Sequence, residues 1–247
     1  KEPTSALKDL EKIVRRAVDT KGKIIIPTFA IERAQELVYY LHLLVDKKKI
    51  PQIPIYMDSP MAVNATGIYQ LHQECYDEAT KEACLCHHKN PFGCNSMTVS
   101  QSVDESKALN NKQGPMIILS ADGMCEAGRV LYHLANNISD PKNIICIVGY
   151  MSEDTLGRKI LDGAKEVKIL GDWYNVNAEV VNIDSFSAHA DYEESLNWLN
   201  SIDTSRLKKI FLVHGEKDAQ ENMTAYLKQN GYPNVEIVKY GESYDLE

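Results

Sequence analysis

The stretch Lys23-Ile24-Ile25-Ile26-Pro27, followed by an amphipathic run to Val45, decides the fold class of this chain. The first segment is a short, continuous apolar run, which is typical of a strand buried on both faces. The second segment has apolar side chains at helical spacing, at Ala30, Ala34, Leu37, Val38, Leu41 and Val45. A buried strand that leads directly into a helix predicts a βαβ unit of a parallel sheet.

The same alternation continues in both directions along the chain. Helices are expected over 4–20, which Gly22 closes, from about 30 to 45, after Ser59-Pro60, and over 104–109, 128–138, 155–164, 192–199 and 219–229. Strands are expected over 53–57, 115–120, 143–150, 209–213 and 235–240, with two more strand-like runs after Gly171. The predicted fold class is therefore α/β with a mainly parallel sheet. The sequence pattern changes near Leu170, and this change predicts two domains, residues 1–170 and residues 171–247.

Composition narrows the class of protein. The 247 residues are 44% hydrophobic and 25% charged, as in ordinary globular proteins. No apolar run approaches the roughly 20 residues of a membrane span, and no leader precedes Pro3, so we expect no membrane partner. The six cysteines are interpreted as reduced and the protein as cytoplasmic. A net charge of −8 argues against long, nonspecific nucleic-acid footprints, although a local cationic site remains compatible with it.

Two histidines follow apolar runs and are the leading candidates for chemistry. His189 comes after the run 178–183, and His214 comes directly after the run 209–213. Side chains just past the carboxyl ends of parallel strands meet in one crevice, where two histidines can share a metal or a phosphate. Gly215 allows a tight turn beside His214, and Glu216 is a candidate to orient it. Asp191 either supports His189 or only caps the helix that follows.

Other polar residues past strand ends suit a bound phosphate. Ser120 offers a hydroxyl and Gly123 a backbone amide, while Arg33, Arg129 and Arg158 can add charge. The plainer interpretation is that Thr28, Ser59 and Asp104 are helix caps and that the arginines are solvated. No Walker A pattern is present, so a nucleoside triphosphate site is not expected.

Several motifs together resemble one family. The segments Phe186-Ser187-Ala188-His189-Ala190-Asp191 and Val213-His214-Gly215-Glu216 resemble motifs B and C of the β-CASP branch of the metallo-β-lactamase superfamily, which contains RNA-processing nucleases. The likeness to bacterial and archaeal members continues upstream in order, through residues 27–36, 58–62, 120–129, 149–150 and 155–158. It covers nearly the whole chain, and the motifs are jointly specific.

This resemblance implies a β-CASP domain over 1–170, with residues 171–247 forming the returning C-terminal part of a metallo-β-lactamase αββα fold. It implies that His214 ligates zinc and that His189 acts beside the scissile phosphate. Ser187, in the same motif as His189, joins Ser120, Gly123 and Arg33 as a phosphate-binding candidate, and Asp191 and Glu216 become supporting residues. The His-x-His-x-Asp-His cluster of the family is absent. We therefore expect a fragment, inert alone, of a longer protein with two zinc ions that hydrolyses single-stranded RNA.

Two rival functions and two smaller questions stay open at this stage. The chain could belong to a non-catalytic scaffold of an RNA-processing complex, or to a DNA-directed nuclease of the same family.

Exposed apolar surface after Gly171 would favour self-association of the chain, such as a homodimer. A cysteine- and histidine-rich segment has residue types that suit zinc but matches no standard zinc spacing, and is interpreted as an exposed loop: Cys84, Cys86, His87, His88 and Cys94.

Overall fold

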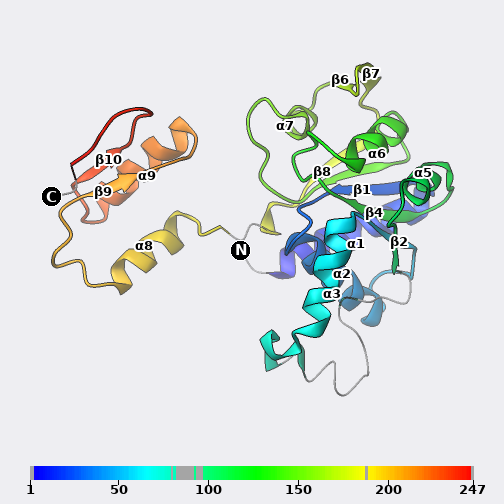
Figure 1. Ribbon diagram of the computed structural model, residues 1–247, viewed down its shortest axis with the longest axis horizontal. Coiled ribbons are helices and arrows are strands. Elements are labelled where there is room, and N and C mark those ends of the chain that lie inside the picture. Colours follow the sequence, from blue (N-terminus) through cyan, green and yellow to red (C-terminus); the bar gives the residue numbers. More distant parts are fainter. Residues whose placement is uncertain (1–2, 79, 82–91, 93–96, 187–188, 246–247) are drawn as a thin grey trace. The chain divides into compact units, whose positions relative to one another are not determined.

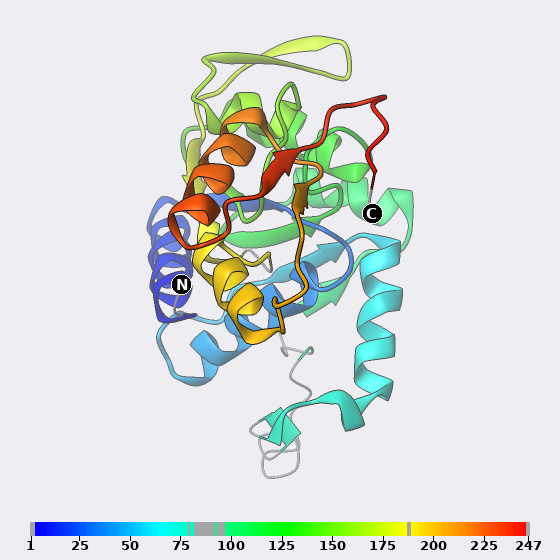
Figure 2. The ribbon, with the colours of Figure 1, turned by 90° about the vertical axis from the view of Figure 1, so that its left-hand side faces the viewer.

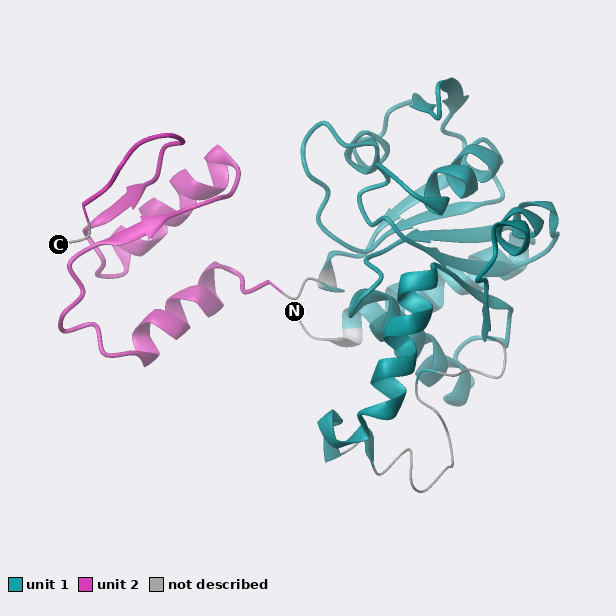
Figure 3. Cartoon of the chain, in the orientation of Figure 1, with its two compact units in different colours: residues 1–187 teal, residues 188–247 magenta. Residues whose placement is uncertain are grey.

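A computed structural model describes residues 3–78, 80–81, 92, 97–186 and 189–245 of the chain. These residues form two compact units, residues 1–187 and residues 188–247, shown in different colours in Figure 3. The cysteine- and histidine-rich segment from Cys84 to Cys94 lies outside the described residues, so its predicted loop structure is not tested.

A six-stranded, fully parallel sheet forms the centre of the first unit (Figure 1). Its strand order is β3-β2-β4-β1-β5-β8. The bounds are β1 Lys23–Pro27, β2 Ile55–Asp58, β3 Met97–Val99, β4 Met116–Ser120, β5 Ile144–Ile147 and β8 Glu179–Asn182. The predicted α/β class with a parallel sheet is confirmed.

Helices cover both faces of this sheet. α1 (Pro3–Thr20) and α2 (Arg33–Asp46) pack on the face that carries Ile24 and Ile26. α5 (Val103–Asn111), α6 (Arg129–Asn137) and α7 (Leu156–Leu161) pack on the opposite face with Ile25. Because successive strand residues point to opposite faces, a strand buried on both sides is apolar throughout. α3 (Pro60–Leu71) follows β2 and begins at the Ser59 cap, as predicted.

The turn that closes α1 depends on Gly22 for a reason other than backbone freedom. The left-handed residue is Lys21, with φ of 55°, and the amide of Gly22 donates to the Ala17 carbonyl 2.9 Å away. A Cβ atom on Gly22 would lie 1.8 Å from the Lys142 carbonyl oxygen. Glycine is therefore needed here because another backbone segment passes directly against it.

A small antiparallel hairpin was not predicted. β6 (Glu166–Ile169) pairs with β7 (Asp172–Asn175), and Leu170 and Gly171 form the turn with φ of 53° and 101°. Two positive φ values in a two-residue loop give the twist that antiparallel neighbours require. The boundary predicted near Leu170 thus falls on a hairpin turn.

The first unit continues well past that turn. β8 pairs with β5 at the edge of the central sheet, and the short helix η2 (Asp184–Phe186) packs beside α1. The compact units divide between Ser187 and Ala188, later than the predicted boundary. The assignment of residues 171–247 to a returning metallo-β-lactamase segment stays a prediction, because compactness alone does not define an inserted domain.

The second unit has a strand–helix–strand core. β9 (Ile210–Leu212) and β10 (Val235–Ile237) are parallel and are joined by α9 (Lys217–Gln229), with α8 (Tyr192–Ser201) preceding them (Figure 2). Its cluster of buried apolar side chains is small, formed by Leu196, Leu199 and Leu227. Among the residues described in both units, none of the helices has the length and apolar character of a membrane span.

Candidate active site

His214 is displayed by a strained backbone at the end of β9. Its φ is 66°, and Gly215 follows with φ of 120°. The Gln220 side-chain amide donates to the His214 carbonyl oxygen at 3.3 Å. A left-handed residue other than glycine costs roughly 1–2 kcal/mol, and such residues cluster at functional sites. The imidazole is exposed, which leaves it accessible to a metal ion. Glu216, half-buried, occupies the N-cap of α9 without a side-chain capping bond.

His189 is exposed in the segment that leads into α8. Two residues later, the Asp191 carboxylate accepts hydrogen bonds from the amides of Glu193 and Glu194, both at 2.9 Å. Glu194 reciprocates by accepting from the Asp191 amide at 3.0 Å, which completes a capping box. Helix capping, the plainer of the two predicted roles of Asp191, is therefore what the contacts show. Ser187 lies outside the described residues.

The described residues do not make a zinc site by themselves. A zinc ion takes about four ligands, of which at least three come from protein in known catalytic sites. No group of three or more histidine, cysteine, aspartate or glutamate side chains gathers around a common point in the described part of the chain. His214 can supply one imidazole ligand, and the remainder of any zinc site has to come from elsewhere.

Ser120 and Gly123 lie in tightly packed surroundings in the first unit. The Ser120 hydroxyl is fully buried and donates to the Asp58 carbonyl at 3.1 Å. Its own carbonyl accepts from the Thr28 amide at 3.0 Å. The N-cap of α2 is Glu32, so Thr28 is not a helix cap. A Cβ on Gly123 would lie 3.3 Å from the Phe29 amide nitrogen. The structure therefore brings the loops after β1 and β4 together, and phosphate binding by this pair stays a prediction.

Arg33 is buried and paired within the protein. It is the first residue of α2, and its Nη1 donates to the Glu36 carboxylate. Its guanidinium lies 5.7 Å from the centre of the Phe186 ring. Burial raises the pKa of Glu36, and the positive charge of Arg33 acts in the opposite direction. Phosphate binding by Arg33 also stays a prediction, but its side chain already has two partners.

A buried polar network around Asp58 was missed by the sequence reasoning. The carboxylate is completely buried and accepts from Arg129 Nη1 at 2.7 Å, from His133 Nε2 at 2.6 Å and from the Ser106 hydroxyl. Arg129 also donates to the carbonyl oxygens of Ser100 and Gln101. Arg129 is therefore a paired, mostly buried side chain, and the prediction that it is solvated is wrong. Arg158 does conform to that interpretation, since it pairs with Asp162 at the surface.

This network fixes the loops beyond β2 and β4. Burial raises the pKa of Asp58, but the hydrogen bonds from His133, Ser106 and Arg129 outweigh it and lower the pKa to about 2. The helix that supplies Ser106 begins after Ser102, which accepts from the Glu105 amide in a capping box, so the predicted Asp104 cap is wrong. The sequence did contain one signal of this network. His133 lies on the apolar face of the helix that begins at Arg129, and a buried histidine needs polar partners.

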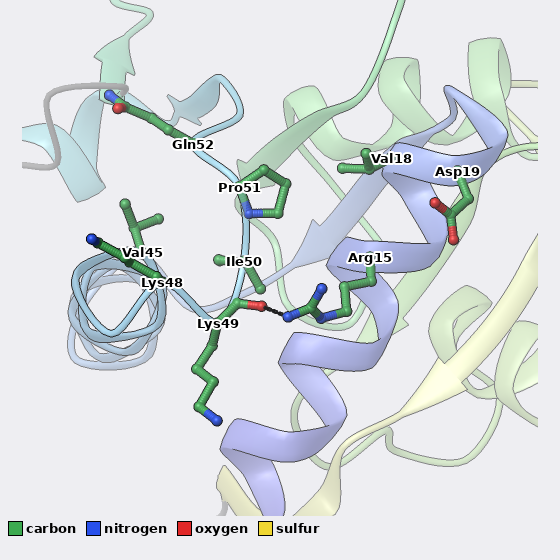
Figure 4. A pocket seen from close by; sticks show the side chains of 9 residues that line it. All are labelled: Arg15, Val18, Asp19, Val45, Lys48, Lys49, Ile50, Pro51 and Gln52. Carbon is green, nitrogen blue, oxygen red and sulfur yellow. Dashed lines mark hydrogen bonds between the residues drawn. The ribbon is translucent and has the colours of Figure 1, made fainter.

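A hollow lined by basic side chains lies at the other end of the central strands from the Asp58 network, and Figure 4 shows its lining residues. Its volume is about 660 Å³, and it lies between α1 and the segment that leads into β2. Arg15 donates to the Lys49 carbonyl across it, and Lys48 and Asp19 also line it. It borders the amino ends of the strands, whereas Ser120 and Asp58 stand at the carboxyl ends. The hollow therefore lies apart from Ser120 and Asp58 within the first unit.

Family models match both parts of the chain. Residues 34–160 match the Beta-Casp domain, and residues 173–238 match the Zn-dependent metallo-hydrolase RNA specificity domain. The second match brackets both His189 and His214. The chain belongs to the β-CASP family of the metallo-β-lactamase superfamily, as its motifs predicted.

Curated relatives share this similarity over most of the chain. Ribonuclease TTHA0252 of Thermus thermophilus is 35% identical over 96% of the chain and 53% of its own length. The RNase J-like protein of Methanocaldococcus jannaschii is 33% identical over 83% of the chain and 45% of its length. Transcription termination factor FttA of Methanosarcina mazei is 30% identical over 87% of the chain and 35% of its length. The chain thus spans about half or less of these relatives.

Proposed function

We propose that the protein containing this chain is a zinc-dependent ribonuclease that hydrolyses phosphodiester bonds of single-stranded RNA. One observation carries the proposal: an RNA specificity domain of zinc-dependent metallo-hydrolases matches the segment that contains both exposed histidines. The ribonuclease names of two relatives support it. The acidic net charge fits an enzyme with a local cationic site better than one that wraps long nucleic acid.

His214 is the zinc ligand that this chain contributes. Its exposed imidazole and its strained backbone support this role. The other ligands would come from sequence outside this chain, which fits its coverage of about half of the Thermus relative. Two zinc ions, when bound, would activate a water molecule and offset the negative charge that develops on the phosphate.

His189 is the candidate acid that assists the leaving oxygen. An imidazole is the side chain best suited to proton transfer near neutral pH. Asp191 fixes the start of α8 two residues after His189, and this cap holds one end of the segment that carries the imidazole. The capping carboxylate therefore acts on His189 through the backbone.

Cleavage of a 5′-labelled single-stranded RNA by the full-length gene product tests the proposal. His214→Asn should remove zinc and activity while keeping the backbone, because asparagine tolerates a positive φ better than alanine. His189→Ala should keep zinc and lose rate, by about 10²- to 10⁴-fold. Wild-type rates in both variants would overturn the assignment. A wild-type protein that binds RNA without zinc or cleavage would favour the scaffold function, and cleavage confined to DNA would favour the DNA-directed nuclease.

Self-association belongs to the same proposal. Trp198, Val213 and Tyr240 are exposed in the second unit, and a second copy of the chain would offer apolar surface against which they could be buried. We expect the isolated chain to form a homodimer, which sedimentation equilibrium tests.

A further inference from the structure

A second cavity of the first unit lies between two of its helices. Its volume is about 630 Å³, and it is lined by α2, by α3 and by the short helix η1 (Gln73–Cys75) with the residues that follow it. α2 and α3 contact each other in the fold (Figure 1). Pockets for small molecules have volumes of about 300–1,000 Å³. The cavity is therefore large enough to hold a small molecule.

Aromatic rings form much of the wall of this cavity. Tyr39 comes from α2, Tyr69 from α3, and Tyr76 follows η1. The Tyr76 hydroxyl donates to the Tyr69 carbonyl oxygen at 2.6 Å. The ring of Phe92 lies edge-on to those of Tyr69 and Tyr76, with centroids 5.4 and 5.7 Å away. Contacts within the protein therefore hold the wall in place, and aromatic faces attract organic cations as well as apolar chains.

The charged groups at this cavity are mainly negative. Glu32 and Glu36 reach it from the start of α2, and Asp77 reaches it from the segment after η1. Among its described lining residues none is a lysine or an arginine, and His72 Nδ1 already lies 2.7 Å from the Glu74 carboxylate. A negative surface repels phosphate and attracts cations. The cavity is therefore unsuited to an RNA backbone and suited to a positively charged ligand.

Glu32 is presented to the cavity by a strained turn. Its φ is 70° and its ψ is −69°, and the Arg33 amide donates to the Ile31 carbonyl oxygen at 3.0 Å. This is the geometry of the rare and strained γ-turn that has a positive φ at its centre. The Glu32 side chain is exposed and makes no capping bond to α2. Backbone strain of this kind clusters at ligand clamps and other functional sites.

Two groups in the cavity have incomplete partners. Burial raises the pKa of Glu36, and the negative charge of Glu32 adds to this rise against the positive charge of Arg33. The two carboxylates therefore repel each other, and a further cation beside them would offset the repulsion. Gln35 also lines the cavity and is buried, and its Oε1 has no hydrogen-bond partner in the described part of the chain. A buried acceptor without a donor is costly, and an ammonium N–H can supply that donor.

We propose that this cavity binds an aliphatic polyamine, a chain of methylene groups that carries two or more ammonium groups. The ammonium groups would pair with the carboxylates of Glu32, Glu36 and Asp77, and the methylene chain would lie along the aromatic wall. The carboxylates come from two separate segments, which favours a ligand with more than one charge over a single cation. This binding does not depend on the proposed ribonuclease function.

Isothermal titration calorimetry of spermidine into the full-length gene product tests the proposal. Glu32→Gln keeps the size of the side chain and removes one exposed charge, so we expect an affinity about 3- to 5-fold lower. Tyr39→Leu keeps an apolar side chain and removes the aromatic ring, so we expect a loss of about 3- to 10-fold. Glu166→Gln is the matched control, because Glu166 is exposed in β6 and does not line this cavity. It should leave the affinity unchanged.

Cys75 provides a second test that locates the bound ligand. It is exposed and lines the cavity. N-ethylmaleimide attached to Cys75 would occupy part of the cavity, so treated wild-type protein should lose most of its spermidine binding. Cys75→Ser treated in the same way should keep its binding, and this variant controls for the reaction of the reagent with other cysteines.

Three results would overturn the proposal. The first is a spermidine affinity that is unchanged in both Glu32→Gln and Tyr39→Leu, or lowered equally in Glu166→Gln. The second is equal loss of binding in wild type and Cys75→Ser after treatment with N-ethylmaleimide. The third is binding of tetralysine but not of spermidine, which would assign the cavity to a protein partner. Failure of the protein to cleave RNA would contradict the proposed function and leave this proposal intact.

Discussion

Replacing Asp58 by asparagine should destabilise the first unit strongly. The two carboxylate oxygens face donors on both sides, Arg129 on Oδ1 and both His133 and Ser106 on Oδ2. An asparagine side chain keeps one acceptor and turns an NH₂ group toward donors on the other side. The charge of Arg129 also loses its buried partner.

Two estimates give the size of the loss in unfolding free energy. Each tenfold change in acid dissociation is worth about 1.4 kcal/mol, so a pKa of about 2 in place of 3.8 corresponds to about 2 kcal/mol favouring the ionised carboxylate in the folded protein. Removing one partner of a buried charge network typically costs about 3–5 kcal/mol, since unpaired groups are left in the interior. We expect a loss of about 3–5 kcal/mol.

Urea unfolding followed by far-UV circular dichroism measures this loss. At about 2 kcal/mol per molar urea, the midpoint should fall by about 2 M. Asp162→Asn is the matched control, because its partner Arg158 is at the surface and such pairs contribute about 0–1 kcal/mol. Midpoints that fall by the same small amount in both variants would refute the reasoning, since the buried network of Asp58 would then contribute no more stability than a surface ion pair.

Three other predictions follow from the packing and the titrating groups. The difference in stability between wild type and Asp58→Asn should be complete above about pH 4 and should shrink as the pH falls toward about 2. The reason is that a lowered carboxyl pKa stabilises the folded state only while that group is ionised. Urea midpoints at several pH values check this. Gly22→Ala should destabilise by several kcal/mol by forcing Lys142 away, whereas Gly67→Ala, with open space around it inside α3, should be neutral or stabilise by up to about 1 kcal/mol in the same urea assay. Iodoacetamide should label exposed Cys75 in the native protein and leave Cys146 unreacted until unfolding, because burial raises the pKa of Cys146 to about 12, and peptide mass spectrometry reads both. Rapid native labelling of Cys146 would contradict its position in the core.

The fold was predictable where burial leaves a clear pattern of apolar residues in the sequence. β1 and β4 are buried on both faces and read as continuous apolar runs, and α2 shows a clear helical stripe. β6 escaped notice because its alternating pattern covers only four residues and its turn, Leu170-Gly171, lacks the usual asparagine or aspartate. β3 is only three residues long, too short to show a period.

The candidate site was predictable only in part, for a different reason. His189 and His214 each follow a local signal, a strand and then a turn, so one sequence suffices to find them. The partners of Asp58 and Phe186 come from distant segments, as with His133 and Arg33, and pairing at that distance leaves no periodic trace. Residue type also misled, because an arginine near a strand end suits a phosphate and suits a buried ion pair equally well.

The zinc content of the full-length gene product, measured by elemental mass spectrometry beside this chain alone, tests the central claim most directly. We expect two zinc ions in the long form, loss of zinc in its His214→Asn variant, and none in the chain alone, because the described residues gather no complete ligand set. Absence of zinc from the long form, or full zinc occupancy without His214, would contradict it.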